Sequence, residues 1–199
     1  MKAKVKAYVV VLALSGLVAV RSGAQSPNPH PAREALKELQ PLIGTWTGEE
    51  EAPGGFEGLT KGRMVIFKWR CRWILKKTAI QFTWDNKFKD NGKPFNFGTA
   101  IITLDPVSKK LHWNSFGYDG KIYWTGTGVG GFKDNALHFA VSEKTINETH
   151  TTYELYWRLL DSTTCLLSHK NLVQDGKAIG DLKDLTLTTV PPKKKATGK

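Results

Sequence analysis

The stretch LIGTWTGEE, from Leu42 to Glu50, places Trp46 between Gly44 and Gly48 at alternate positions, directly after the helix-like run AREALKELQ. Glycine weakens a strand, so two glycines around a large aromatic residue indicate a crowded entrance to a sheet, where the backbone passes close to another segment. We therefore expect a short helix over about residues 32–40 and a first strand that begins at this segment.

After Ile43 the chain is a series of segments in which apolar and polar residues alternate, the pattern of half-buried strands. In MVIFKWRCRW (64–73), apolar residues occupy the odd positions and basic residues occupy positions 68, 70 and 72. Turn signals such as Asp105-Pro106 and the hairpin pair Asp119-Gly120 separate the segments. The sequence predicts ten strands, in LIGTW, MVIFKWRCRW, TAIQFTW, FNFGTAIITL, LHWNSFGY, KIYWTGTGV, ALHFAVS, TYELYWRLL, TTCLLSHKNL and DLKDLTLTTV.

The connections between these strands are short, which favours antiparallel pairing of successive strands. Ten such strands in one domain are best accommodated by a closed sheet, since closure removes the exposed edges. We predict an all-β fold, a ten-stranded antiparallel barrel over residues 32–190 that is wide enough to leave a lumen. The N-terminal helix would close one end, and Trp46 would plug that end while its two glycines allow close approach.

The two ends of the chain lie outside this domain. Residues 1–24 combine three lysines, a short apolar run and the small-residue exit SGA, which predicts a signal peptide cleaved after Ala24 and no membrane span in the mature chain. Residues 25–31 would be a flexible leader, and the protein would be periplasmic or extracellular. Loss of four of the 29 basic residues and none of the 18 acidic ones lowers the net charge from +11 to +7. Four of these charges lie in the basic tail 191–199, which we expect to be disordered.

Cys71 and Cys165 are the only cysteines. An exported chain meets an oxidising compartment, so a disulfide between them is one alternative. Two unpaired thiols, each buried on an apolar strand face, are the other. The sequence does not distinguish between the two.

The segment LQPLIGTWTGE resembles the Gly-x-Trp entry motif of calycins, the superfamily of lipocalins, fatty-acid-binding proteins and nitrobindins. Together with APGGFEG, ITLDPVSKKLHWNSFGYDGKIYWTGTG and DGKAIGDLKDLTLTTV, it makes residues 36–190 similar to an exported bacterial family of lipocalin-like domains of unknown function. The resemblance implies a calycin-like barrel with a small-molecule cavity, and no established reaction or ligand. Nitrobindins hold haem through a late histidine, but the surroundings of His169 in LLSHKN do not match well enough to transfer that role.

No motif in the sequence identifies a catalytic residue, a metal site or a cofactor. GTGVGG has the G-x-G-x-x-G spacing, but a dinucleotide site needs a helix there, and FKDNALHFA predicts a turn and a strand. H-E-x-x-H, C-x-x-C and G-x-S-x-G do not occur. The mixture of cations and aromatics in KWRCRWILKK is explained by the two faces of one barrel strand, so we expect no nucleic-acid partner.

The seven tryptophans provide large apolar walls for a site inside the barrel. The residues predicted to line the lumen are Trp46, Phe67, Trp69, Phe82, Trp84, Trp113, Trp124, Tyr153, Trp157 and His169. We therefore predict that the protein binds a small, mainly apolar molecule without transforming it. Two alternatives remain: a small hydrolase or isomerase that uses His169 or Glu154, and an interaction module whose lumen is filled and whose exterior cations bind the partner.

Overall fold

The computed structural model of the protein describes residues 30–52 and 61–191. The predicted signal peptide, nearly all of the leader and the basic tail from residue 192 onward lie outside the described residues. Within the described ranges, no helix combines the length and the apolar character that a membrane span requires.

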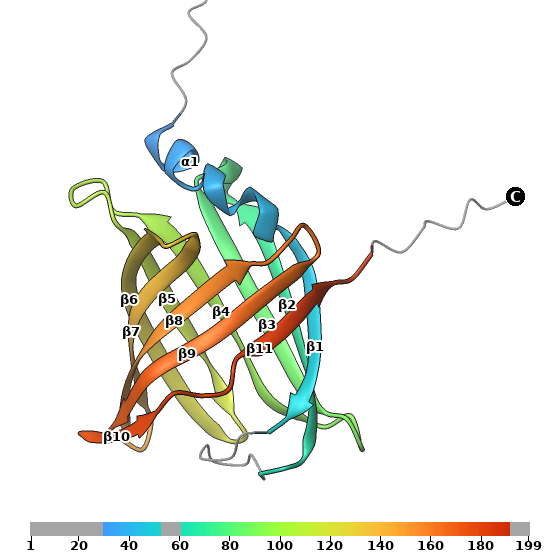
Figure 1. The fold of residues 1–199 in the computed structure, drawn as a ribbon. Coiled ribbons are helices and arrows are strands. Elements are labelled where there is room, and N and C mark those ends of the chain that lie inside the picture. The colour runs from blue at the N-terminus through green and yellow to red at the C-terminus, as the bar shows by residue number, and fades with distance from the viewer. Residues whose placement is uncertain (1–29, 53–60, 192–199) are drawn as a thin grey trace, which may run out of the picture.

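The secondary structure is a short helical segment followed by strands (Figure 1). The helical segment consists of α1 (Pro31–Ala35) and the 3-10 helix η1 (Lys37–Leu42), and a second 3-10 turn, η2 (Leu75–Lys77), joins two strands. The strands are β1 (Gly44–Glu51), β2 (Met64–Ile74), β3 (Ala79–Phe88), β4 (Pro94–Leu104), β5 (Leu111–Asp119), β6 (Ile122–Lys133), β7 (Ala136–Thr145), β8 (His150–Leu159), β9 (Thr164–Gln174), β10 (Lys177–Gly180) and β11 (Leu185–Thr189).

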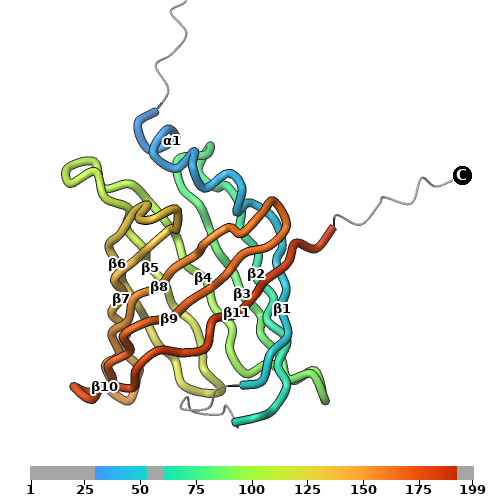
Figure 2. Tube along the Cα trace, in the orientation of Figure 1, coloured from blue at the N-terminus to red at the C-terminus, as the bar shows by residue number. Residues whose placement is uncertain are grey.

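The strands form one closed antiparallel barrel (Figures 1 and 2). Each strand from β1 to β9 pairs with its neighbours along the chain, and β11 pairs with both β9 and β1 to complete the ring. The predicted all-β barrel with ten strand positions is therefore confirmed. Closure leaves no long free edge among the described strands for pairing with another chain.

The tenth strand position differs from the prediction, because it is divided between two short strands. β8 pairs along one edge of β9, while β11 pairs with Thr164–Leu167 and β10 with Leu172–Gln174 on the other edge. The predicted loop VQDGKA thus contains part of β10, and residues 181–184 interrupt the pairing. Asp181 explains the interruption, since its Oδ1 accepts the backbone N–H of Asn171 at 2.9 Å in place of a strand partner.

The helical segment closes one end of the barrel, at the top of Figure 1. Leu36, Leu39 and Leu42 are buried there with Trp46, whose indole N–H donates to the carbonyl oxygen of Leu42 at 2.8 Å. Gly48 shows the close approach that the alternating glycines predict, because a Cβ at this position would lie 2.4 Å from the carbonyl oxygen of Thr186 on β11. The first strand therefore needs a glycine where the barrel closes.

The core lies inside the barrel and follows the alternation of the strands. Cys71 and Cys165 are both buried in it as free thiols, so the structure supports the second alternative and not the disulfide. Burial raises the pKa of Cys165 to about 12 and that of Cys71 further. Neither thiol is in the ionised form that reacts with oxidants or metals at neutral pH.

Candidate functional site

A cavity of about 470 Å³ occupies the half of the barrel away from the helical segment. It extends from the aromatic core to the end where β1 finishes and β2 begins, and its wall includes Ala52 and Gly62 from those two strand ends. The volume lies within the range of pockets that hold drug-sized molecules. The predicted lumen is thus present, and the side chains of the described residues do not fill it.

Seven of the ten residues predicted to line the lumen lie in the cavity wall, and three do not. The seven are Phe67, Trp69, Trp84, Trp113, Trp124, Tyr153 and His169. Trp46, Phe82 and Trp157 are buried deeper, in the core toward the helical segment. The reason is position along the strands: alternation places a side chain inside, but only its height in the barrel decides whether it reaches the cavity.

Three tryptophans form a row along one side of the wall. Trp69, Trp84, Gly98, Gly117 and Trp124 are cross-strand partners in sequence, from β2 to β6. The rings of Trp69 and Trp84 stack at 4.9 Å, and those of Trp84 and Trp124 at 5.9 Å with an interplanar angle of 12°. The row provides flat aromatic surface of the kind on which a planar molecule stacks.

The indole rings are held by packing more than by hydrogen bonds. The N–H groups of Trp69 and Trp113 are buried and have no hydrogen-bond partner among the described residues. Trp113 instead packs against Trp157 and Phe139, with ring centroids 5.6 Å apart in both pairs. The floor of the cavity is therefore a continuous aromatic cluster.

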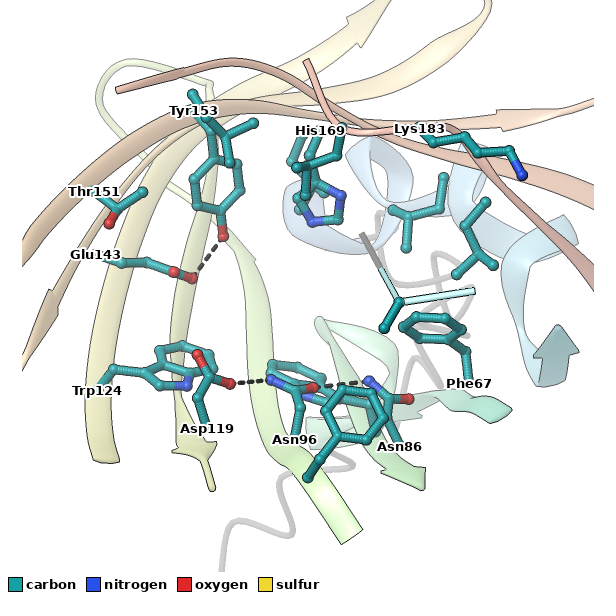
Figure 3. A pocket seen from close by; sticks show the side chains of 18 of the residues that line it. Phe67, Asn86, Asn96, Asp119, Trp124, Glu143, Thr151, Tyr153, His169 and Lys183 are labelled. Atoms are coloured by element: carbon teal, nitrogen blue, oxygen red, sulfur yellow. Dashed lines mark hydrogen bonds between the residues drawn. The ribbon is translucent and has the colours of Figure 1, made fainter. Parts of the chain in front are cut away.

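A polar chain crosses the wall on the side of the tryptophan row that is farther from the helices (Figure 3). Asn86 accepts the backbone N–H of Lys68 at 3.1 Å and donates to Asn96 at 2.8 Å, and Asn96 donates to Oδ1 of Asp119. These residues are also cross-strand partners, on β3, β4 and β5. Burial raises the pKa of Asp119, while the hydrogen bond from Asn96 opposes this rise.

A second carboxylate, that of Glu143 on β7, faces the same space. Its Oε1 accepts the hydroxyl of Tyr153 on β8 at 2.6 Å. Both residues are half-buried and line the cavity. Burial raises the pKa of Glu143 to about 7, with a further contribution from the negative charge of Asp119. Burial and the Glu143 carboxylate raise the pKa of Tyr153 well above its usual value.

His169 on β9 points into the cavity, as its alternation with Cys165 and Leu167 predicts. Its ring lies 5.4 Å from that of Tyr153. Burial lowers the pKa of His169 to about 4, against the smaller opposing effect of Asp184. The imidazole is therefore neutral at physiological pH and adds no positive charge to the wall.

Sequence reasoning missed the polar residues of the wall and misplaced one candidate. Asn86, Asp119 and Glu143 share strand parity with Trp84, Trp113 and Phe139, which is the signal that places them inside. Glu154, proposed as an alternative catalytic group, is on the outer face, because its neighbours Tyr153 and Leu155 face the lumen. There it accepts the hydroxyl of Tyr156 at 2.7 Å.

No group of three or more histidine, cysteine, aspartate or glutamate side chains is arranged to hold a metal ion in the described part of the chain. The wall combines aromatic rings, amides and hydroxyls with four carboxylates, of which Glu50 and Glu51 lie at the end where β1 finishes.

Comparison with known proteins supports the fold. No protein-family model matches the chain, and a search of curated proteins found no match. The crystal structure of Rv2717c from M. tuberculosis is similar over 79% of this chain and 98% of that chain, with 13% identity and a TM-score of 0.53. At this identity the likeness concerns the fold alone, and together with the closed barrel it fits a calycin-like barrel.

Proposed function

We propose that the protein binds a small, largely apolar molecule inside the barrel. The observation that supports this most directly is a lumen of about 470 Å³ that the described residues leave open beside a row of stacked indole rings. Large aromatic surfaces with a few placed polar groups are typical of ligand pockets. The cavity weakens the alternative of an interaction module, since that alternative requires a filled barrel.

The wall is suited to binding because it is already ordered. The indoles of Trp84 and Trp124 are 6% and 5% exposed and are fixed by stacking on each other, so little side-chain freedom remains to be lost. A ligand that enters such a site replaces water on apolar surface without a large ordering cost. Stacking of a planar ligand on these rings adds to that gain.

Titration with a neutral lipophilic dye such as Nile red tests the proposal, with tryptophan fluorescence as a second signal. Thr151 faces the cavity from β8, and Thr152 is its neighbour on the outer face. Thr151→Phe should fill the site and weaken dye binding about tenfold or more, whereas Thr152→Phe should not. Equal binding by both variants, or no binding by the wild type, contradicts a lumen site. Native mass spectrometry of protein from its own host would identify a co-purified ligand.

We also propose that the protein is an exported member of the lipocalin-like family that its sequence resembles. The support is the tripartite N-terminal segment, with lysines, an apolar run and small residues before Gln25. Mass spectrometry of the mature protein should find an N-terminus at or near Gln25. An intact Met1 in the mature fraction contradicts export by cleavage.

A second candidate function is acid–base chemistry on the bound molecule. The observation that favours it is Glu143, a half-buried carboxyl group beside a phenol in the cavity, with a pKa raised to about 7. Glu143 here replaces Glu154, which sequence reasoning had suggested. Recovery of the co-purified molecule unchanged after prolonged incubation with fresh protein argues for binding alone, and its conversion argues for catalysis.

A further inference from the structure

We propose that the cavity selects an organic cation: an aromatic body that lies on the tryptophan row and a protonated amine that lies between Glu143 and Asp119. The inference rests on the proposed function, since it names the class of ligand for the same cavity. It is more specific, because the apolar walls alone would accept neutral, anionic and cationic ligands alike.

The first argument is the charge of the wall. Neither Glu143 nor Asp119 forms an ion pair with any lysine, arginine or histidine among the described residues. A buried carboxylate without a counter-ion is unfavourable, and a ligand cation would relieve that cost.

The cationic residues that do line the cavity are not available to an anionic ligand near the carboxylates. Lys61 is exposed in the turn before β2, and Lys183 pairs with Glu50. Figure 3 shows Lys183 on the opposite side of the cavity from Glu143, with His169 between them. A carboxylate ligand at this end of the cavity would meet the negative charges of Glu143 and Asp119, and the neutral His169 would not compensate them.

The second argument is the hydrogen-bonding capacity that remains. Tyr153 already uses its hydroxyl hydrogen to bond Oε1 of Glu143, so it offers no donor to an incoming acceptor group. Oε2 of Glu143 accepts no hydrogen bond from the described residues, and Glu143 lines the cavity. An ammonium group, which only donates, matches this acceptor-rich end.

The third argument is the aromatic surface next to the carboxylates. Trp124 lies beside Asp119 and stacks on Trp84 (Figure 3). A cation over an indole face gains electrostatic attraction, and the gain is larger at a desolvated site than in water. The same rings hold the apolar body of the molecule, so one wall serves both parts of an aromatic amine.

Three probes of the same shape and different charge test the inference by isothermal titration calorimetry at about pH 8, where Glu143 is ionised. They are 2-(2-naphthyl)ethylamine, 2-(2-naphthyl)ethanol and 3-(2-naphthyl)propanoate. The amine should bind about tenfold or more tightly than the alcohol, as one charge-assisted hydrogen bond provides, and the acid should bind most weakly. This comparison needs no variant and therefore does not depend on the folding of one.

Glu143→Gln and Asp119→Asn should each remove most of the preference for the amine and leave affinity for the alcohol nearly unchanged. Glu154→Gln is the matched control, because Glu154 also accepts a tyrosine hydroxyl but lies on the outer face. It should retain the preference. Loss of the preference in this control, or its retention in Glu143→Gln and Asp119→Asn, overturns the assignment.

The outcomes separate the two proposals. If the alcohol and Nile red bind but the amine binds no more tightly, or the acid binds most tightly, the inference is wrong and the lumen-binding function stands. If neither the dye nor any of the three probes binds, the proposed function fails and the inference fails with it.

Discussion

The indole ring of Trp84 lies flat against Gly98, its cross-strand partner on β4. A Cβ at Gly98 would lie 2.6 Å from Cζ2 of Trp84, and one at Gly117 would lie 2.9 Å from Cζ2 of Trp124. Gly98 and Gly117 are themselves partners across β4 and β5. Two inward glycines therefore make room for two indoles, and the wall of the cavity depends on the pair.

Gly98→Ala should displace Trp84 and disturb the wall of the cavity. Overpacking of this kind costs about 1–3 kcal/mol of unfolding free energy, and Nile red affinity should fall with it. Gly131→Ala is the control, since a Cβ there meets no atom within 4 Å and its backbone does not require glycine. Chemical denaturation of both variants checks the prediction, and equal stability would show that the Trp84 contact is readily relaxed.

The walls of the barrel were predictable from the sequence, whereas its polar site was not. Alternation assigned Trp84, Trp113 and Trp124 to the inside because large apolar residues on one strand face must be buried. Glu143 shares the inward parity of Phe139, but a carboxylate near a strand end is usually solvated, so parity alone did not predict its burial. Only closure of the sheet encloses it with Asp119, and that depends on strands far apart in the sequence.

The division of the last strand position also could not be predicted from the local alternation of apolar and polar residues. DLKDLTLTTV predicts one strand, but the side chain of Asp181 competes for the backbone N–H of Asn171. Lys170 adds an ion pair to Asp184 at 2.8 Å, which holds the interrupted segment against β9. Such side-chain competition depends on the register of the partner strand, which local alternation does not encode.

Trp46→Phe should destabilise the end of the barrel that the helical segment closes. The change removes the donor to the carbonyl oxygen of Leu42 and leaves a void beside Leu36 and Leu39. Together these effects should cost about 2–4 kcal/mol. Trp73→Phe is the control, because its indole donates to Gln40 at a more exposed position. A smaller loss in Trp46→Phe than in Trp73→Phe, measured by denaturant unfolding, contradicts the role of Trp46 as the plug.

Binding of a permanently charged cation should strengthen as pH rises through about 7, the pKa of Glu143. A quaternary probe such as (2-naphthylmethyl)trimethylammonium keeps its charge, so the protein alone supplies the pH dependence. Ionised Glu143 attracts the cation and protonated Glu143 does not; affinity should rise about tenfold between about pH 5.5 and about pH 8.5.

Other groups around Glu143 affect this profile in known directions. Asp119 has a raised pKa and adds to the same trend, whereas Tyr153 stays protonated throughout the range. His169 is neutral across it, and Lys183, whose pKa is raised by the Glu50 carboxylate, remains charged, so neither of these two reverses the trend. In Glu143→Gln the profile should flatten. A wild-type affinity that is constant with pH, or that falls as pH rises, excludes Glu143 as the partner of the cation.

The neutral state of His169 should make the barrel sensitive to acid. Its pKa is about 4 in the folded protein against 6.5 in the unfolded chain, so the unfolded state binds more protons between these values. The stabilisation is fully present above about pH 6.5 and is lost as pH falls toward 4, by at most about 3 kcal/mol.

His169→Gln cannot be protonated, so its unfolding free energy should fall less than that of the wild type over this window. Glu143 titrates in the opposite sense in both proteins, and the difference between them therefore isolates His169. Parallel urea-unfolding profiles for wild type and His169→Gln from about pH 7 to about pH 4 would show that the histidine is solvated and not enclosed by the cavity wall.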